Sequence, residues 1–305
     1  MERRRIGTLE VSVVGLGCNN FGWRIDKAAT REVVAAALDA GINFLDTADM
    51  YGAGQSEEFL ADALGSRRED VVLATKFGMS MGEGKSGAKR AYIREACEAS
   101  LRRLKSDHID LYQLHTPDTS TSITETLGAL DELVKAGKVR EIGCSNFKAD
   151  QLQSAASAVK PGAAKFVSVQ NNYSLLHREP EQGVLQECRK LGIAFIPYFP
   201  LANGMLSGKY RKGQPAPENS RGKDAWGPNM FSDKNLDIVE KLIDYAERHG
   251  RTLLELAVSW LAAQDTVTSV ITGAKTVDQV RTNAAAANWK LAPADLAAID
   301  AITAG

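Results

Sequence analysis

The sequence predicts an α/β fold, a (β/α)8 TIM barrel, and three observations support this prediction. Short apolar runs typical of buried strands alternate with amphipathic helical segments roughly eight times along the chain. This alternation indicates parallel strands, because parallel neighbours need crossover helices, and eight such units close into a barrel. The length of 305 residues suits one barrel of ~250 residues with insertions. No linker separates two doubly wound domains, so residues 1–305 are expected to form a single domain.

The predicted strands are apolar runs without strict alternation, as expected for strands covered on both faces. They span residues 11–18, 42–48, 71–77, 108–115, 139–146, 165–172, 193–199 and 267–273. The predicted helices have apolar residues at helical spacing and span 27–40, 56–65, 88–104, 122–137, 148–159, 180–192, 235–249, 252–263 and 276–287. A long loop, 200–232, follows the seventh strand, and an extra C-terminal helix follows Pro293.

Composition excludes several classes of function. Apolar residues make up 44% of the chain and charged residues 25%, as in ordinary soluble globular proteins. The formal net charge of -1 creates no overall field that would attract nucleic acid or anionic lipid. No apolar run approaches the ~18 residues of a membrane span, and no signal-peptide core follows the N-terminal arginines. These features favour a cytoplasmic protein whose partner is a small molecule.

The cysteines predict neither a disulfide framework nor a metal site. Cys18, Cys97, Cys144 and Cys188 are widely separated, with no CxxC motif and no His at metal-ligand spacing. We expect reduced thiols, as is usual in cytoplasmic proteins, and no bound metal.

Polar residues stand at the ends of three consecutive predicted strands. Asp46 lies near the end of the second strand with Tyr51 in the loop behind it, Lys76 lies near the end of the third, and His115 ends the fourth. The chemistry of an α/β barrel gathers at the C-terminal ends of its strands, so these side chains are expected at one rim. Taken singly, each is explained as a turn former or a solvated strand end. Because a buried Lys and a buried Asp each need a partner, we expect Asp46 and Lys76 to pair.

Together the four residues suit the protonation of an oxygen that gains negative charge. Tyr has an ordinary pKa of about 10, and a nearby ammonium lowers the pKa of a phenol. Lys76 is therefore expected to lower the pKa of Tyr51 while Asp46 holds Lys76, and His115 can orient the substrate oxygen. The set contains no Ser or Cys nucleophile paired with a base, and it lacks the paired carboxylates of a glycosidase. Asp49, in the same segment, is interpreted as a loop-forming residue.

Motifs spread over nearly the whole chain resemble the aldo-keto reductase family, in particular its longer-chain bacterial members. The similarity lies in NFLDTADMYG (43–52), ATKFG, DLYQLH, IGCSNF, VQNNYSLLHR, YFPLANGMLSGKY and VITGAKTVDQVRTN, in the family's order. The resemblance implies a catalytic tetrad of Asp46, Tyr51, Lys76 and His115, with Tyr51 as general acid. It also implies an oxidoreductase that transfers hydride from a nicotinamide cofactor to the carbonyl carbon of an aldehyde or ketone. The family's N-terminal hairpin, which caps the barrel floor, is expected to be small.

The same resemblance implies where the cofactor binds. Tyr198 matches the aromatic residue that stacks on the nicotinamide. Lys275 and Gln279, at the start of the eighth helix, match the site for the 2′-phosphate of NADP, and a helix N-terminus favours anions through its free N–H groups. NADP(H) is therefore expected, with NAD(H) as the alternative. The residues implied in cofactor binding are Cys18, Asn19, Asp46, Ser145, Asn146, Gln170, Tyr198, Phe199, Pro200, Leu201, Asn203, Lys209, Arg221, Gly273, Lys275, Gln279 and Asn283.

Three residues depart from the family's pattern. Phe199 stands where many relatives have Ser, Thr272 where a Pro is common, and Thr282 where many have Glu beside the adenine. These departures concern the adenine contacts and the cofactor preference, and they leave the tetrad intact.

The loops after the strands are expected to form the substrate pocket. Its candidate lining is aromatic and apolar apart from one His, and consists of Phe21, Trp23, Tyr51, Phe77, His115 and Trp226. The segment GMSMGEGKSGAKR (78–90) is flexible by composition and is a candidate lid. An aromatic mouth suits aldehydes, ketones or sugar-like carbonyl compounds, and the sequence leaves the choice among them open.

Three alternatives are open on the sequence alone. The segment VVGLGCNNFG resembles a dinucleotide-binding GxGxxG motif, but Asn20 stands at the third glycine and Asp46 lies farther on than the usual ~20 residues. A nucleotide-sensing regulatory subunit could keep the same barrel and tetrad with little turnover. A barrel enzyme of unrelated chemistry would require Asp46 and Lys76 not to be neighbours.

Overall fold

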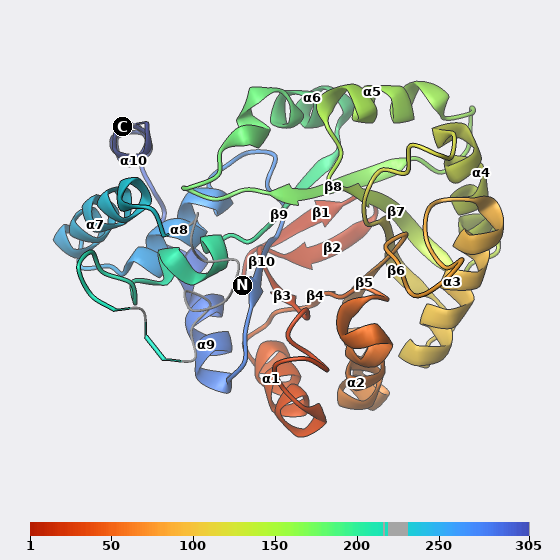
Figure 1. Ribbon diagram of the computed structural model, residues 1–305, viewed down its shortest axis with the longest axis horizontal. Helices are drawn as coiled ribbons and strands as arrows, with labels where there is room; N and C mark the ends of the chain where they lie inside the picture. The colour runs from red at the N-terminus through yellow and green to blue at the C-terminus, as the bar shows by residue number, and fades with distance from the viewer. Residues whose placement is uncertain (216, 219–230, 305) are drawn as a thin grey trace.

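The computed structural model describes residues 1–215, 217–218 and 231–304. Within this part of the chain, eight parallel strands form one sheet in the order β10-β3-β4-β5-β6-β7-β8-β9. The sheet closes through a parallel bridge between Phe195 of β9 and Val267, and Figure 1 shows helices surrounding the strands. The predicted barrel is confirmed, with strands β3 (Val14–Gly17), β4 (Phe44–Asp46), β5 (Val72–Phe77), β6 (Ile109–Leu114), β7 (Val139–Ser145), β8 (Phe166–Asn172), β9 (Ala194–Tyr198) and β10 (Val270–Gly273).

The helices form the outer layer in the predicted alternation. Neighbours pack side by side around the barrel, and α1 also contacts α9, beside the paired strands β3 and β10. No helix in the described ranges is long and apolar enough to cross a membrane. The helices are α1 (Lys27–Asp39), α2 (Gln55–Leu64), α3 (Arg90–Leu104), α4 (Ile123–Lys135), α5 (Ala149–Ala158), α6 (Val184–Leu191), α7 (Asp233–Arg248), α8 (Leu253–Ala262), α9 (Val277–Ala285) and, against α7, the extra helix α10 (Pro293–Thr303).

An antiparallel hairpin covers the N-terminal end of the barrel. Its strands are β1 (Arg3–Ile6) and β2 (Leu9–Ser12). Ile6 and Leu9 are buried in one cluster with Phe44, at the start of β4, and with other inward-facing residues. The predicted first strand, 11–18, is wrong in one respect: the chain divides at Val13 into the end of β2 and the barrel strand β3. The hairpin fills the N-terminal end of the barrel, so the C-terminal end is open to the loops that follow the strands.

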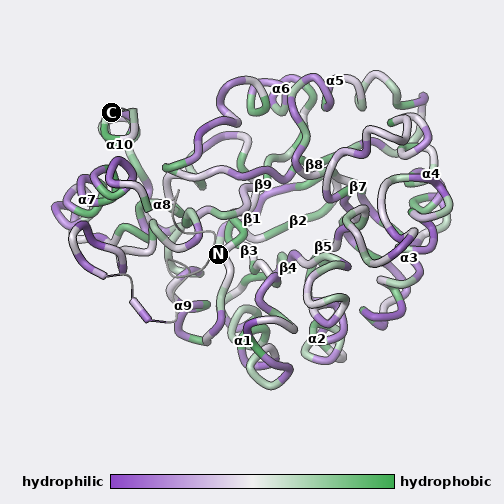
Figure 2. The backbone as a smooth tube through the Cα atoms, in the orientation of Figure 1, coloured by the Kyte–Doolittle hydropathy of each residue, from purple (hydrophilic) through white to green (hydrophobic). Residues whose placement is uncertain are grey.

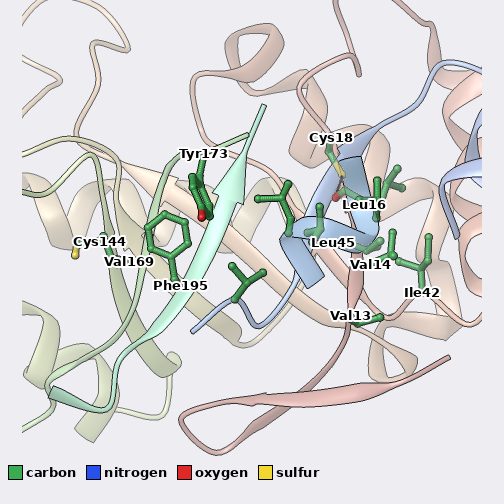
Figure 3. Close-up of a cluster of buried hydrophobic side chains, with 14 of the residues drawn as sticks. Val13, Val14, Leu16, Cys18, Ile42, Leu45, Cys144, Val169, Tyr173 and Phe195 are labelled. Atoms are coloured by element: carbon green, nitrogen blue, oxygen red, sulfur yellow. Dashed lines mark hydrogen bonds between the residues drawn. The ribbon is translucent and has the colours of Figure 1, made fainter. Parts of the chain in front are cut away.

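Side chains of the barrel strands alternate between two apolar clusters, as the two-residue period of a strand requires. Outward-facing residues such as Leu16 and Leu45 belong to the cluster between sheet and helices, part of which Figure 3 shows. Inward-facing residues such as Phe44 and Leu111 form a separate cluster inside the barrel. Figure 2 shows hydrophilic and hydrophobic residues interleaved along the outer helices, as expected for amphipathic helices that cover a core.

A long connection follows the seventh barrel strand, as predicted. It begins after Tyr198, contains the short 3₁₀ helix η4 (Ala202–Ser207) and ends where α7 begins. Two predicted site residues on this loop, Arg221 and Trp226, lie outside the described residues.

Candidate active site

The period of the strands turns the predicted polar residues toward the inside of the barrel. In β4, Phe44 belongs to the inner cluster, so Asp46 faces inward as well. In β5, Ala74 belongs to the same cluster, and Lys76 follows on that face. His115 continues the inward face of β6 just beyond its last residue. Three neighbouring strands thus place polar side chains on top of an apolar layer.

Lys76 and Asp46 form the buried ion pair expected from the sequence. Lys76 Nζ lies 2.5 Å from Asp46 Oδ1 and donates a second hydrogen bond to the Thr47 carbonyl at 2.8 Å. Lys76 is fully buried and Asp46 is 3% exposed. Burial by itself lowers the pKa of a lysine, but the charge of Asp46 and the phenol of Tyr51 outweigh it, so the pKa of Lys76 is raised. The lysine is therefore held inside the barrel as an ammonium.

The second oxygen of Asp46 accepts two amide hydrogen bonds. Gln170 Nε2 donates to Asp46 Oδ2 at 2.8 Å, and Gln113 Nε2 donates to the same oxygen at 3.1 Å. Sequence reasoning assigned no role to Gln113. The alternation of β6 could have revealed it, because Gln113 lies between Leu111 and His115 on the inward face.

Tyr51 begins the 3₁₀ helix η1 (Tyr51–Gly54) in the loop after β4. Lys76 Nζ lies 5.1 Å from the centroid of its ring, and the ring packs edge-on against His115 with 5.8 Å between centroids. The expectation that Lys76 lowers the pKa of Tyr51 holds for the effect of the lysine itself, but the pKa of Tyr51 as a whole lies above its ordinary value. Burial raises the pKa of Tyr51, and the charge of Lys76 offsets this only in part. The phenol therefore keeps its proton at neutral pH.

Two hydrogen bonds hold the backbone of His115 in place. Its N–H donates to the Phe77 carbonyl at 2.8 Å, and its carbonyl accepts from Asn146 Nδ2 at 2.9 Å. Burial, together with the charge of Lys76, lowers the pKa of His115 to about 3. Its Nδ1 has no hydrogen-bond partner among the described residues. A neutral imidazole in this position can donate one hydrogen bond to an oxygen in front of it.

A cavity of about 630 Å³ lies at the C-terminal end of the barrel, within the ~300–1,000 Å³ range of ligand pockets. Tyr51 and His115 are part of its wall, whereas the fully buried Lys76 is not. All the described residues predicted to bind the cofactor line this cavity: Cys18, Asn19, Asp46, Ser145, Asn146, Gln170, Tyr198, Phe199, Pro200, Leu201, Asn203, Lys209, Gly273, Lys275, Gln279 and Asn283.

One wall of the cavity is formed by the ends of β7, β8 and β9. Ser145 Oγ donates to the Gln170 carbonyl at 2.7 Å, and Asn146 Nδ2 lies 3.2 Å from Ser145 Oγ. The hydroxyl of Tyr198 donates to Asn146 Oδ1 at 2.8 Å. Amide groups, a hydroxyl and an aromatic ring are thus joined in one network at the surface of the cavity.

A second part of the wall is the N-terminal end of α9. Thr276 caps this helix by accepting a hydrogen bond from the Gln279 N–H at 3.3 Å. Gln279 Oε1 in turn accepts from the Lys275 N–H at 2.8 Å. Lys209, from the loop after β9, contributes a further cationic side chain to the cavity. Two lysines and a helix N-terminus make this region suited to anionic groups.

The aromatic residues predicted for the substrate pocket are placed differently. Tyr51 and His115 line the cavity, but Phe21 and Phe77 do not. Both phenylalanines are fully buried, because they pack into the apolar layer between the sheet and the helices. Trp23 is 64% exposed and lies outside the wall. Of the described residues predicted for the substrate pocket, Tyr51 and His115 thus line the cavity, whereas a substrate contact of the other three stays a prediction.

Several lining residues were missed by sequence reasoning. Met79 belongs to the candidate lid, 78–90, and Thr116 follows His115, so extending the strand ends by a few residues would have found both. A hydrogen bond joins residues near the two ends of this candidate lid: the Gly87 N–H donates to the Gly78 carbonyl at 2.8 Å. The further lining residues are Gly17, Asn20, Arg24, Gly204, Ser207, Leu254 and Ile271.

Gly15, the first glycine of VVGLGCNNFG, has a packing role in the barrel. A Cβ atom on Gly15 would lie 2.9 Å from the Phe44 side chain and 2.9 Å from Ser269 Oγ. The strand that carries it, β3, is hydrogen-bonded to β4 and β10 within the closed sheet. The alternative of a doubly wound dinucleotide-binding fold is therefore wrong.

Comparisons with known proteins agree with this architecture. A family model described as the aldo/keto reductase family matches residues 13–304. The uncharacterized oxidoreductase YqkF of Bacillus subtilis is 36% identical over 296 residues, 94% of this chain and 92% of that protein. The probable aldo-keto reductase 1 of Glycine max is 35% identical over 96% of this chain and 86% of its own length. The solved structure of the aldo-keto reductase AKR11C1 from Bacillus halodurans, in its holo form, has a TM-score of 0.83 and 33% identity, with 99% of this chain and 96% of that chain covered. The chain therefore belongs to the aldo/keto reductase family and is an oxidoreductase.

Proposed function

We propose that this protein is an NADP(H)-dependent aldo-keto reductase that reduces an aldehyde or ketone, including sugar-like carbonyl compounds, to the alcohol. The observation that supports this most is that Tyr51 and His115 pack together in the wall of one cavity, with the buried ammonium of Lys76 5.1 Å from the centroid of the Tyr51 ring. A protonated phenol, a fixed ammonium and a neutral imidazole suit the delivery of a proton to a developing alkoxide. Membership of an oxidoreductase family supports the reaction class.

The cavity wall fits a nicotinamide dinucleotide. Ser145, Asn146 and Gln170 would hold a carboxamide, because together they present hydroxyl and amide groups to the cavity. Tyr198 adds an aromatic ring beside them. Lys209 and the N-terminal end of α9 would hold phosphate groups. When bound, the nicotinamide supplies the hydride that is added to the carbonyl carbon.

The preference for NADP(H) over NAD(H) rests on Lys275 and Gln279. Both line the cavity at the start of α9, and the Gln279 side chain is held by the Lys275 N–H. A lysine at the N-terminal end of a helix favours an extra phosphate. These residues would therefore bind the 2′-phosphate that distinguishes NADP(H) from NAD(H).

Four residues act together to deliver the proton: Asp46, Tyr51, Lys76 and His115. Tyr51 donates its hydroxyl proton to the substrate oxygen, and the ammonium of Lys76 stabilises the phenolate left behind. Asp46 keeps Lys76 in place through the 2.5 Å contact. His115, neutral because of its lowered pKa, donates a hydrogen bond that orients the oxygen.

A panel of aldehydes and ketones with NADPH or NADH tests the proposal. We expect NADPH to be oxidised with formation of one alcohol per cofactor consumed, and a lower KM for NADPH than for NADH. Tight NADPH binding with negligible turnover on every carbonyl compound would instead favour a nucleotide-sensing subunit. The alternative of a barrel enzyme of unrelated chemistry required Asp46 and Lys76 to lie apart, and they are in contact.

A further inference from the structure

Gln113 is a polar residue in the middle of the barrel, away from the cavity. It is fully buried on β6, and it is not part of the cavity wall. On its own strand it follows Leu111, which belongs to the apolar cluster inside the barrel. Its Nε2 donates to Asp46 Oδ2 at 3.1 Å. The side chain thus reaches the ion pair from a side that no bound molecule in the cavity contacts.

Burial of this amide is unfavourable by itself. Gln113 Oε1 is buried and has no hydrogen-bond partner among the described residues. A buried amide with one end unsatisfied is less favourable than an apolar side chain of the same shape. The reverse orientation of the amide would place its oxygen against a carboxylate oxygen, and a carboxylate accepts hydrogen bonds only. The bond to Asp46 is therefore the interaction that accounts for a glutamine at this position.

The neighbouring strand leaves room for the side chain. Gln113 is in register with Gly143 of β7. A Cβ atom on Gly143 would lie 3.3 Å from Gln113 Cγ and 2.4 Å from Ser168 Oγ. Any larger residue at 143 would press on both side chains, so the glycine keeps Gln113 free to extend toward Asp46.

We propose that Gln113 is a positioning residue that holds the carboxylate of Asp46, from the side away from the cavity, in the rotation that pairs it with Lys76. The inference rests on the proposed function, because the pair acts by fixing the ammonium beside Tyr51. Asp46 Oδ1 faces Lys76, and Asp46 Oδ2 is fixed by Gln113 and Gln170. Loss of one of two amide donors lets the carboxylate rotate and loosens Lys76.

The two glutamines differ in one respect that a kinetic experiment can detect. Gln170 lines the cavity and Gln113 does not. Gln170→Leu is expected to change the KM for NADPH as well as kcat. Gln113→Leu is expected to lower kcat roughly 10-fold and to change the KM and the Kd for NADPH less than Gln170→Leu does, since Gln113 itself is not part of the cavity wall and acts there only through Asp46.

Stability provides the second readout. Urea unfolding of Gln113→Leu is expected to show a midpoint close to that of the wild type, because loss of the hydrogen bond to Asp46 and removal of an unsatisfied amide oxygen act in opposite directions. Ser168→Ala is the matched control: it alters a fully buried polar residue beside the same glycine, whose hydroxyl makes no hydrogen bond to a described residue, and should leave kcat unchanged. A Gln113→Leu variant with unchanged kcat, or with kcat lowered only in proportion to lost folded protein, would overturn the proposal.

A glutamate at the same position tests the donor directly. Gln113→Glu can donate to Asp46 only while its new carboxyl is protonated, and two adjacent carboxyls share a proton. The ratio of its kcat to that of the wild type should therefore fall as pH rises. A ratio that is constant with pH would contradict the positioning role.

A titration without substrate separates this proposal from the proposed function. Ultraviolet difference spectra between each protein and its Tyr51→Phe counterpart report the ionisation of Tyr51 alone. In Gln113→Leu the phenol should titrate at higher pH than in the wild type, because Lys76 is held less firmly against it. If no carbonyl compound is reduced but this shift is present, the proposed function fails and the positioning role stands. If carbonyl reduction is found but the shift and the kcat effect are both absent, only the positioning role fails.

Discussion

Replacing Asp49 with Asn is predicted to remove a pH dependence of the free energy of unfolding. Asp49 lies between the tetrad residues Asp46 and Tyr51, is 1% exposed and forms no ion pair within the described ranges. Burial, followed by the charge of Glu57, raises the pKa of Asp49 from 3.8 to about 7. The Met50 N–H and nearby cations oppose this increase only in part.

The sign and size of the effect follow from these pKa values. The folded protein keeps the proton of Asp49 up to about pH 7, whereas the unfolded chain loses it near 3.8. Over this window the folded state binds more protons, so the free energy of unfolding falls as pH rises and the loss is complete above about pH 7. One pKa unit corresponds to about 1.4 kcal/mol, so the loss between about pH 5 and about pH 7 is at most ~3 kcal/mol.

His115 acts with the opposite sign in an overlapping window. Its pKa is lowered from 6.5 to about 3, so the unfolded chain binds the proton first. The free energy of unfolding therefore rises with pH between these two values. The two effects oppose each other in the wild type, and the difference between wild type and Asp49→Asn isolates Asp49.

Urea unfolding of both proteins at about pH 5 and about pH 8 measures this difference. The free energy of unfolding of Asp49→Asn relative to that of the wild type should be higher at about pH 8 than at about pH 5, by up to ~3 kcal/mol. Glu69→Gln, which changes an exposed carboxylate, is the control and should show the same difference at both pH values. An equal difference at the two pH values for Asp49→Asn would refute the argument that burial keeps this carboxyl protonated.

Three further predictions concern the site. Lys76→Met should lower the free energy of unfolding by about 3–5 kcal/mol, because it leaves Asp46 buried without its ammonium. The control is Lys135→Met, which breaks a surface ion pair with an i,i+4 partner. It should change the free energy of unfolding by about 0–1 kcal/mol. If urea unfolding showed a similar loss of the free energy of unfolding for both variants, the Asp46–Lys76 pair would not be isolated from water. The pH profile of kcat/KM should show no inflection belonging to His115 near 6.5, since burial lowers its pKa to about 3; an inflection that disappears in His115→Gln would contradict this. Lys275→Met should raise the KM for NADPH roughly 10-fold and leave the KM for NADH unchanged, and an equal rise for both cofactors in steady-state assays would show that Lys275 does not bind the 2′-phosphate.

The sequence predicted those features that depend on the period of strands and on chain order. Alternation of strands and helices predicted the barrel, and the ends of consecutive strands predicted that Asp46 and Lys76 meet. Both predictions follow from local rules, because parallel strands place their C-terminal ends at one rim and side chains on a strand alternate between its faces.

Features that depend on packing were harder to predict. Phe21 and Phe77 are as apolar as pocket residues, but their burial depends on how helices cover the sheet. The pKa of Tyr51 depends on the balance between burial and the charge of Lys76, and only the assembled site shows that burial dominates. The division of the first predicted strand at Val13 depends on the hairpin that folds under the barrel. Each of these outcomes depends on how the segments pack in the assembled barrel.

The measurement that tests the central claim most directly is the rate of carbonyl reduction by Tyr51→Phe. The substitution removes only the hydroxyl, and NADPH binding, followed by fluorescence titration, serves as the control for an intact cavity. If Tyr51 is the proton donor, kcat should fall by roughly 10²–10⁴-fold while the Kd for NADPH is unchanged. A variant that binds NADPH and reduces the same aldehyde at the wild-type rate would contradict the account.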